Sequence, residues 1–250
     1  QRDLSNSHDR IGDVRKGQGD LAGALVAYEA ALAIRERLSA LDPNHTEWQR
    51  DLAISHERIG DVRKEQGDLV GARESFEKEL TIALPLFAKT GAAEVPRFLG
   101  TVYRRLVVVC AAQGDWQAAL EYGRERVAQS RRAADPADLA CALGTQSYCL
   151  LLDRQFQAAI TAAEEALTLN PGLLWVVTNQ AHGYLLTEQF DRAQAIYQNH
   201  ATEMVREGQT FAQVVLDDFD ALREQGIDHP MMEDIADLFR QSVPLDAEAK

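Results

Sequence analysis

Long apolar runs are missing from this sequence. No stretch approaches 18 consecutive apolar residues, and the first residues do not form a basic segment followed by an apolar one. A membrane-spanning helix needs about 20 apolar residues, and a secretion signal needs a basic start with an apolar centre. We therefore expect neither a membrane span nor a secretion signal, and we expect a cytoplasmic protein that has no membrane among its partners.

Cysteine is scarce as well. The three cysteines, Cys110, Cys141 and Cys149, are an odd number without a tight motif, and their neighbours are apolar. This pattern is typical of small core side chains in a reducing compartment. His182 has no cysteine, aspartate or second histidine at the spacing of metal ligands, so the sequence predicts no metal site.

Basic residues are too few to balance the acidic ones. The chain has 26 Lys and Arg against 39 Asp and Glu, a net charge of −13, which disfavours nucleic acid as a partner. The charge is uneven, because residues 97–132 carry seven basic and three acidic side chains, whereas residues 203–250 carry four and twelve. A basic middle between acidic ends is able to orient a charged partner, and solvated helix faces are the alternative.

The usual motifs of catalysis are missing too. No nucleophile is paired with a base in a known motif, and no glycine-rich phosphate loop is present. Asp217, Asp218 and Asp220 lie within a helical pattern, on different faces and without the glycine of a calcium loop. The sequence predicts a non-catalytic protein without a cofactor, in which these aspartates belong to a solvated face.

A copied segment is the strongest positive signal. Residues 2–24 return as residues 50–72 with 18 of 23 positions identical, at a spacing of 48 residues. Such copying indicates helical hairpins that stack on one another as a solenoid. A solenoid presents a long continuous face and no deep cleft, which favours a scaffold or adaptor.

The turns inside the hairpins mark five units. Gln-Gly-Asp before a large apolar residue occurs three times, ending at Leu21, Leu69 and Trp116. The glycine stops one helix and the aspartate caps the next. The segments 154–156 and 188–190 keep this geometry with other residue types and place phenylalanine in the apolar position. Five hairpins are therefore predicted.

These features resemble the tetratricopeptide repeat family, whose unit is a pair of antiparallel helices. The resemblance covers roughly residues 1–204, although Val107, Gly123 and Ala163 depart from the family pattern. The spacing of 48 residues exceeds the family length of about 34, and the long first hairpins resemble kinesin-light-chain-like arrays. The resemblance depends on small residues in the first helices, alanines in the second helices, aromatic residues four positions later and closing prolines: Gly12, Gly60, Ser147, Ala181, Ala24, Ala72, Ala119, Ala159, Ala193, Tyr28, Phe76, Tyr197, Pro43 and Pro171.

The resemblance implies an all-α fold, a right-handed superhelix or α-solenoid of about five helical hairpins plus a C-terminal capping helix pair. Pro85 is expected to kink or end its helix near Leu84. The FDALR and HP segments near the end resemble the C-terminal ends of some bacterial tetratricopeptide regions fused to effector domains, so a bacterial source is expected. We expect units at about 1–43, 44–91, 92–136, 137–170 and 171–204, capping helices at 205–243 and a disordered tail at 244–250.

In this family the first helix of each unit lines a concave groove that binds peptides. A basic segment would be attracted by the acidic part of this groove and anchored through an apolar side chain near its aromatic part. The alternative is that the charges face solvent and the aromatic residues are ordinary packing residues. The resemblance implies a partner-binding groove formed by Asp9, Asp13, Glu57, Asp61, Lys64, Arg104, Tyr148, Trp175 and His182.

The expected function is non-catalytic recognition of a protein or peptide, as part of a larger intracellular protein. Two alternatives stay open. The chain is a self-association module of a longer array, or it is the regulatory arm of an enzyme or effector whose catalytic domain lies outside this fragment. His8 and His56 are related by the same shift of 48 residues and are expected to be structural.

Overall fold

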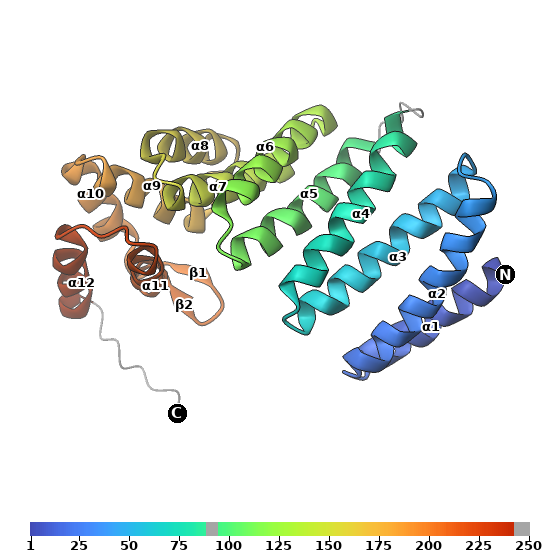
Figure 1. Cartoon of the computed structure of the whole chain (residues 1–250). Coiled ribbons are helices and arrows are strands. Elements are labelled where there is room, and N and C mark those ends of the chain that lie inside the picture. Colours follow the sequence, from blue (N-terminus) through green and yellow to red (C-terminus); the bar gives the residue numbers. More distant parts are fainter. Residues whose placement is uncertain (89–94, 243–250) are drawn as a thin grey trace. The chain divides into compact units, whose positions relative to one another are not determined.

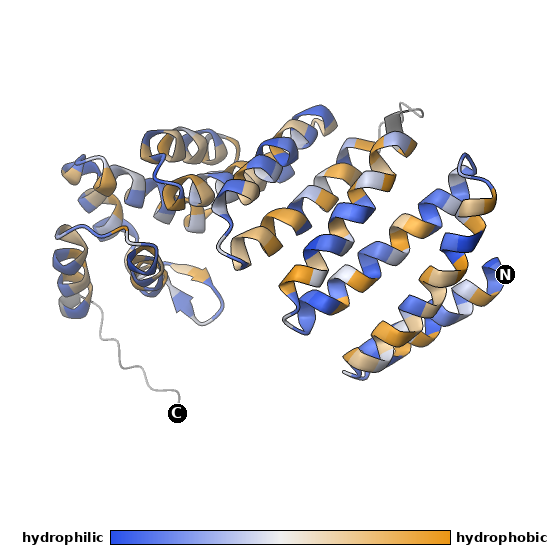
Figure 2. Cartoon of the chain, in the orientation of Figure 1, coloured by the Kyte–Doolittle hydropathy of each residue, from blue (hydrophilic) through white to orange (hydrophobic). Residues whose placement is uncertain are grey.

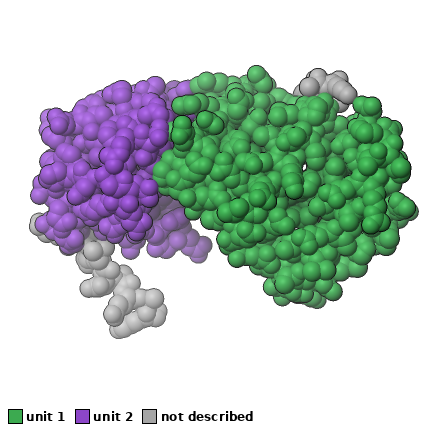
Figure 3. All heavy atoms as spheres, in the orientation of Figure 1, with its two compact units in different colours: residues 1–133 green, residues 134–250 purple. Residues whose placement is uncertain are grey.

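The computed structural model describes residues 1–88 and 95–242 (Figure 1). The chain forms two compact units, residues 1–133 and residues 134–250, which Figure 3 shows in green and purple. The predicted unit boundary at 91–92 and the predicted tail at 244–250 lie outside the described residues. Each unit is described by itself.

Unit 1 consists of three helical hairpins. Each helix packs on its hairpin partner, and α2 and α4 also pack on the first helix of the next hairpin, so the unit is a continuous stack. Orange and blue bands alternate along these helices in Figure 2, as expected for helices with one buried and one exposed face. The helices are α1 (Arg2–Gly17), α2 (Leu21–Leu41), α3 (Thr46–Glu65), α4 (Leu69–Ala88), α5 (Val95–Ala112) and α6 (Trp116–Ala133).

Unit 2 contains two shorter hairpins followed by a β-hairpin and two further helices. The pair β1 and β2 is antiparallel, and Gly208 in its turn has a φ of 75°. The sequence did not predict these strands, because strands of three and two residues are too short to show an alternating pattern. The elements are α7 (Pro136–Leu152), α8 (Phe156–Leu169), α9 (Leu174–Leu186), α10 (Phe190–His200), β1 (Met204–Arg206), β2 (Gln209–Thr210), α11 (Phe211–Glu224) and α12 (Met231–Ser242).

The inner turns share one backbone conformation. Gly19, Gly67 and Gly114 have φ angles of 79°, 82° and 74°, in the left-handed region that ends a helix. Arg154 and Glu188 stand at the same turn position with φ angles of 60° and 61°. The turn geometry is therefore common to all five hairpins, although only three of them have the glycine that adopts it without strain.

Close packing inside the hairpins explains the small residues of the repeat. A Cβ atom at Gly12 would lie 2.4 Å from Cε1 of Tyr28, and one at Gly60 would lie 2.5 Å from Cε1 of Phe76. The two aromatic rings therefore occupy the space that a side chain would need. The alanines of the second helices are buried in the same way: Ala24, Ala72, Ala119, Ala159 and Ala193.

The sequence predicted that Pro85 would kink its helix or end it near Leu84. The helix does not end there. Helix α4 continues through Pro85 to Ala88. The proline lies in the last turn of the helix, where its missing N–H removes a single hydrogen bond, to the carbonyl of Thr81. A proline in this position leaves the rest of the helix intact.

Candidate functional site: a paired charged face and a pocket

The first helices of unit 1 are joined by ion pairs. Arg2 in α1 contacts two carboxylates of α3, Glu47 at 2.6 Å and Asp51 at 2.7 Å. At the other end of α1, Lys16 lies 2.9 Å from Glu65. Neighbouring first helices thus present one shared polar surface, which is the surface that the sequence predicted as a groove.

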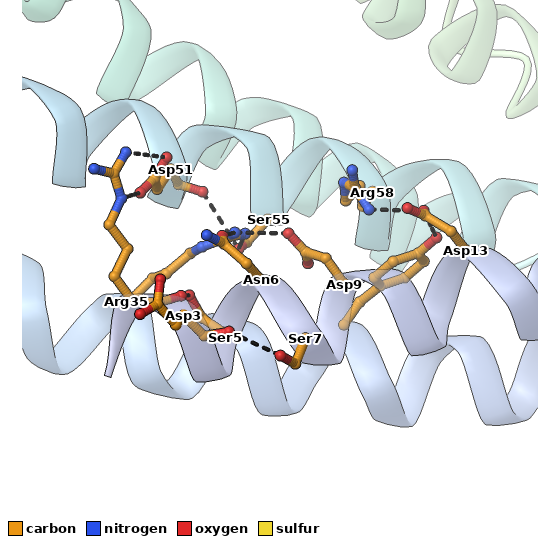
Figure 4. Close-up of polar contacts among 12 residues, drawn as sticks. Asp3, Ser5, Asn6, Ser7, Asp9, Asp13, Arg35, Asp51, Ser55 and Arg58 are labelled. Atoms are coloured by element: carbon orange, nitrogen blue, oxygen red, sulfur yellow. Dashed lines mark hydrogen bonds and ion pairs between the residues drawn. The ribbon is translucent and has the colours of Figure 1, made fainter.

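Asp9 is nearly buried beneath this surface. Its Oδ2 accepts a hydrogen bond from Nη2 of Arg35 at 2.6 Å, and Nη1 of Arg35 donates to Oγ of Ser55 at 2.7 Å (Figure 4). Nη2 of Arg35 also donates to Asn6 at 3.1 Å. Arg35 therefore links α1, α2 and α3, and Asp9 serves this contact instead of facing a partner.

Asp13 is exposed but has two partners of its own. Its Oδ1 accepts hydrogen bonds from the Tyr28 hydroxyl and from Nη1 of Arg58, each at 2.7 Å. Burial acts to raise the pKa of Asp13, but the bonds from Tyr28 and Arg58 outweigh it, and the pKa lies below its ordinary value. Asp13 is consequently an ionised carboxylate that an arginine already neutralises.

Arg105, not the predicted Arg104, is the arginine that meets the acidic residues of α3. Its guanidinium contacts Glu57 and lies 3.7 Å from Asp61 and 3.6 Å from Glu79. Burial raises the pKa of Glu79 to about 8, against the influence of Arg105. Arg104 itself points to solvent. The predicted acidic face is thus largely neutralised by arginines of neighbouring helices.

Lys64 and Arg104 are the two predicted groove residues of unit 1 whose charges are not engaged. Lys64 is half-buried and Arg104 is exposed. Neither has a hydrogen bond or ion pair with any described residue of the chain. A small cavity of about 290 Å³ opens beside Glu57 and Arg105, between α3, α4 and α5. This cavity lies beside the charged residues of α3 and α5.

Tyr148 and Trp175 meet in unit 2. Both are half-buried, and both line a pocket of about 450 Å³. The pocket is mostly apolar, with polar groups at its edges, as binding sites for side chains generally are. Burial first, and the Asp218 carboxylate second, raise the pKa of Tyr148 to about 12, so its hydroxyl is neutral. The pocket is lined by Thr145, Tyr148, Trp175, Thr178, Asn179, Val205, Arg206, Val214 and Asp218.

The third predicted groove residue of unit 2, His182, is fully buried and does not reach this surface. Its Nδ1 lies 2.8 Å from the Tyr197 hydroxyl, and its Nε2 lies 3.2 Å from Oδ2 of Asp218. The prediction failed for His182 because α11 packs on α9 and covers that position. His182 instead connects the core to the carboxylate at the edge of the pocket.

Four of the pocket residues come from elements that the sequence did not place at the groove. Val205 and Arg206 come from β1, and Val214 and Asp218 come from α11. The prediction assigned Asp218 to a solvated capping face. The apolar spacing of α11 did indicate that this helix packs on the array, but the β-hairpin that brings Arg206 to the pocket has no comparable signal.

Asn179 lies deeper in the same pocket wall. Its Nδ2 donates to the Gly144 carbonyl at 3.1 Å and to Oγ of Ser147 at 2.9 Å. The amide nitrogen is therefore used to hold α9 against α7. Asn179 therefore stabilises the pocket wall, and its Nδ2 donors are used in that contact.

Within residues 1–88 and 95–242, no group of three or more His, Cys, Asp or Glu side chains is placed to hold a metal ion. In the same ranges, no helix is long and apolar enough to cross a membrane.

Comparison with known proteins identifies the fold. No protein-family model matches the sequence, and the search of curated proteins finds no match. A crystal structure of MamA protein matches with a TM-score of 0.58 and 18% identity, over 90% of this chain and 96% of that chain. YrrB, described as a TPR protein with an unusual peptide-binding site, matches with a TM-score of 0.55 and 18% identity, over 76% and 81% of the two chains.

A third solved structure also matches this chain. It is a putative kinesin light chain of Podosopora anserina with nearly identical TPR-like repeats, with a TM-score of 0.60 and 18% identity over 79% of this chain and 93% of that chain. These structures are TPR proteins, and this chain has the same TPR-like, all-α solenoid fold. The predicted fold class is confirmed.

Proposed function

We propose that this chain is a non-catalytic scaffold that binds a segment of a partner protein, and that the pocket of unit 2 takes an apolar side chain of that segment. The observation that carries the proposal is the meeting of Tyr148 and Trp175 in a pocket of about 450 Å³. A half-buried aromatic pair beside apolar walls is the usual anchor site for one partner side chain.

The charge of the chain supports a partner with basic residues beside this anchor. The net charge is −13, and Asp218 lies at the edge of the pocket. Arg206 lies at the same edge, so the basic residues of the partner belong outside the pocket while the apolar side chain enters it. Long-range attraction raises the association rate of such a segment and is weakened by salt.

The paired carboxylates of unit 1 have a smaller part in this proposal than the sequence suggested. Glu57 and Asp61 are already paired with Arg105. Their replacement by lysine would therefore disturb the contact between α3 and α5 as well as the charge. For this reason the decisive test uses the pocket of unit 2.

The test begins with peptides selected on the intact chain from a phage-displayed random library. We expect the selected peptides to share one large apolar residue with lysine or arginine nearby. Tyr148→Ala with Trp175→Ala should weaken their binding at least tenfold in calorimetry, since anchor residues commonly contribute more than 1.4 kcal/mol. Thr145→Trp, which fills the pocket, should have the same effect through bulk.

The matched control is Trp48→Ala, which removes a half-buried tryptophan of α3 that lines neither of the two cavities described above. It should leave peptide affinity unchanged. Circular dichroism establishes that each variant keeps its helicity. Selected peptides that bind the pocket variants as tightly as the unaltered chain would remove the pocket from the proposal, and failure to select any peptide would count against peptide recognition altogether.

A further inference from the structure

The outer face of α1 exposes a stripe of apolar side chains. Leu4, Ile11 and Val14 are 55%, 46% and 60% exposed. They follow one another at intervals of seven and three residues, so they lie on one side of the helix. Single apolar residues scattered on a surface are ordinary, but these three lie on one face of one helix, and we call them the strip of α1.

The repeat contains the same strip in a buried form. A shift of 48 residues converts these three positions into Leu52, Ile59 and Val62, which are 9%, 2% and 0% exposed. The residue types are identical in the two helices, and only their surroundings differ. The contacts of these residues in α3 therefore indicate which kind of surface would pack on the strip of α1.

Helix α2 covers the strip of α3. Ile59 and Val62 share a core cluster with Ala24 and Tyr28, and three leucines of α2 pack around it: Leu21, Leu25 and Leu32. This contact is the interface between consecutive hairpins in the stack. On α1, the equivalent apolar side chains are exposed, because none of the described residues packs on them.

The polar residues around the strip repeat as well. In α3, Arg63 pairs with Glu29 of α2 at 3.4 Å. The equivalent residue of α1 is Arg15, and the two arginines are held alike, since Nη1 of Arg15 donates to the Gly23 carbonyl at 3.1 Å and Nη1 of Arg63 donates to the Gly71 carbonyl at 3.3 Å. Arg15 is thus oriented as Arg63 is, but it has no acidic partner among the residues that the structure describes.

Two further positions follow the same rule. Arg58 of α3 pairs with Asp13 at 2.7 Å, whereas its equivalent Arg10 is exposed and has no ion pair with any described residue. Asp51 accepts from Arg2 at 2.7 Å, whereas its equivalent Asp3 is exposed. Around the apolar strip, two basic side chains and one acidic side chain of α1 therefore have no oppositely charged partner among the described residues. The equivalent side chains of α3 each have one.

We propose that this face of α1 is a docking surface for another helical hairpin of the same repeat type, whose second helix lies on α1 as α2 lies on α3. The occupant has leucines where α2 has them, an acidic residue at the position of Glu29, a carboxylate at that of Asp13 and an arginine at that of Arg2. An intact second copy of this chain does not fit this description, because its own α3 already covers that face of α2. The proposal is independent of the pocket in unit 2.

The test is a chain in which residues 1–48 are placed once more before Gln1. The repeat makes this junction continuous, since Gln1 occupies the position of Gln49. The added hairpin should fold on α1, raise the melting temperature by several degrees and slow amide exchange in α1 at least tenfold. An added hairpin that exchanges like an unfolded chain would overturn the proposal.

Variants of the strip separate docking from unrelated effects. Ile11→Glu with Val14→Glu in the original α1 should abolish both gains in the extended chain, while the melting temperature of the unextended chain should change far less, since these side chains face solvent there. Ile11→Ala with Val14→Ala is a milder pair that should reduce the gains in part. Gains that survive both pairs would contradict the proposal.

Light scattering of the unextended chain across concentration completes the test. A concentration-independent monomer is expected, because no copy presents the hairpin surface that the strip requires. A dimer that the glutamate pair converts to a monomer would show that α1 binds a second copy of itself, and it would overturn the choice of occupant.

Discussion

Arg35 and Asp9 form an ion pair of 2.6 Å although the two side chains are 4% and 10% exposed. The contact joins the second helix of the first hairpin to its first helix, and the same guanidinium reaches Ser55 in the next hairpin. A pair buried to this extent is costly to break, because the remaining partner stays charged and without compensation.

Arg35→Ala should therefore lower the free energy of unfolding by about 3–5 kcal/mol. The second hairpin has Ala83 at the equivalent position, so alanine itself suits the local packing. Arg35→Ala combined with Asp9→Ala should be less destabilising than the sum of the two single changes. Urea unfolding of the four chains measures this coupling, and simple additivity would show that the two residues do not act as a pair.

Glu79 should make the chain less stable as pH rises from about 5 to about 8. Its pKa is about 8 in the folded chain, against 4.5 as the ordinary value, mainly because the side chain is buried. Below pH 4.5 both states hold the proton and the group adds no penalty. Between the two values only the folded state keeps it, so the free energy of unfolding falls with rising pH.

Glu79→Gln should remove this contribution, because glutamine does not ionise. The difference in stability between Glu79→Gln and the unaltered chain should grow between pH 5 and pH 8 in urea unfolding. Glu74→Gln, on an exposed position of the same helix, is the control and should show no such growth. A difference that stays constant with pH would mean that Glu79 is ionised throughout.

Glu188→Gly should stabilise unit 2. Glu188 has a φ of 61°, a conformation that costs a residue with a side chain about 1–2 kcal/mol and costs glycine little. The greater freedom of glycine in the unfolded chain offsets part of the gain, so we expect about 0.5–1 kcal/mol. Thermal unfolding measures it. Gly67→Ala, at the equivalent turn with a φ of 82°, should change stability in the opposite direction.

Gly60→Ala should destabilise unit 1 by about 1–3 kcal/mol, because its Cβ would lie 2.5 Å from the Phe76 ring. Gly100→Ala is the matched control. Gly100 is a buried helical glycine of the same unit, and its Cβ would meet only Cβ of Gln129, at 3.8 Å. Alanine there should be neutral or stabilising, as it is a better helix former. Equal effects of the two changes would exclude the ring contact as the cause.

The sequence by itself determined the helices, their pairing into hairpins and the fold class. These depend on residues close together in the chain. Examples are the Gly-Asp pair of the first three turns, and the aromatic residue that follows the buried alanine by four positions and packs on the small residue of the preceding helix. Even the turns without glycine, at Arg154 and Glu188, were recognised from their neighbours, since a turn is a local structure.

Only the tertiary structure decided which charges are free and which side chains share a pocket. Asp9 and Arg35 are 26 residues apart in the chain, and nothing near either of them names the other. Asp218 reaches the pocket of Tyr148, and His182 is buried, because α11 packs on α9. These outcomes depend on contacts between distant segments, which periodicity does not encode, so the sequence predicted the proposed binding face only in outline.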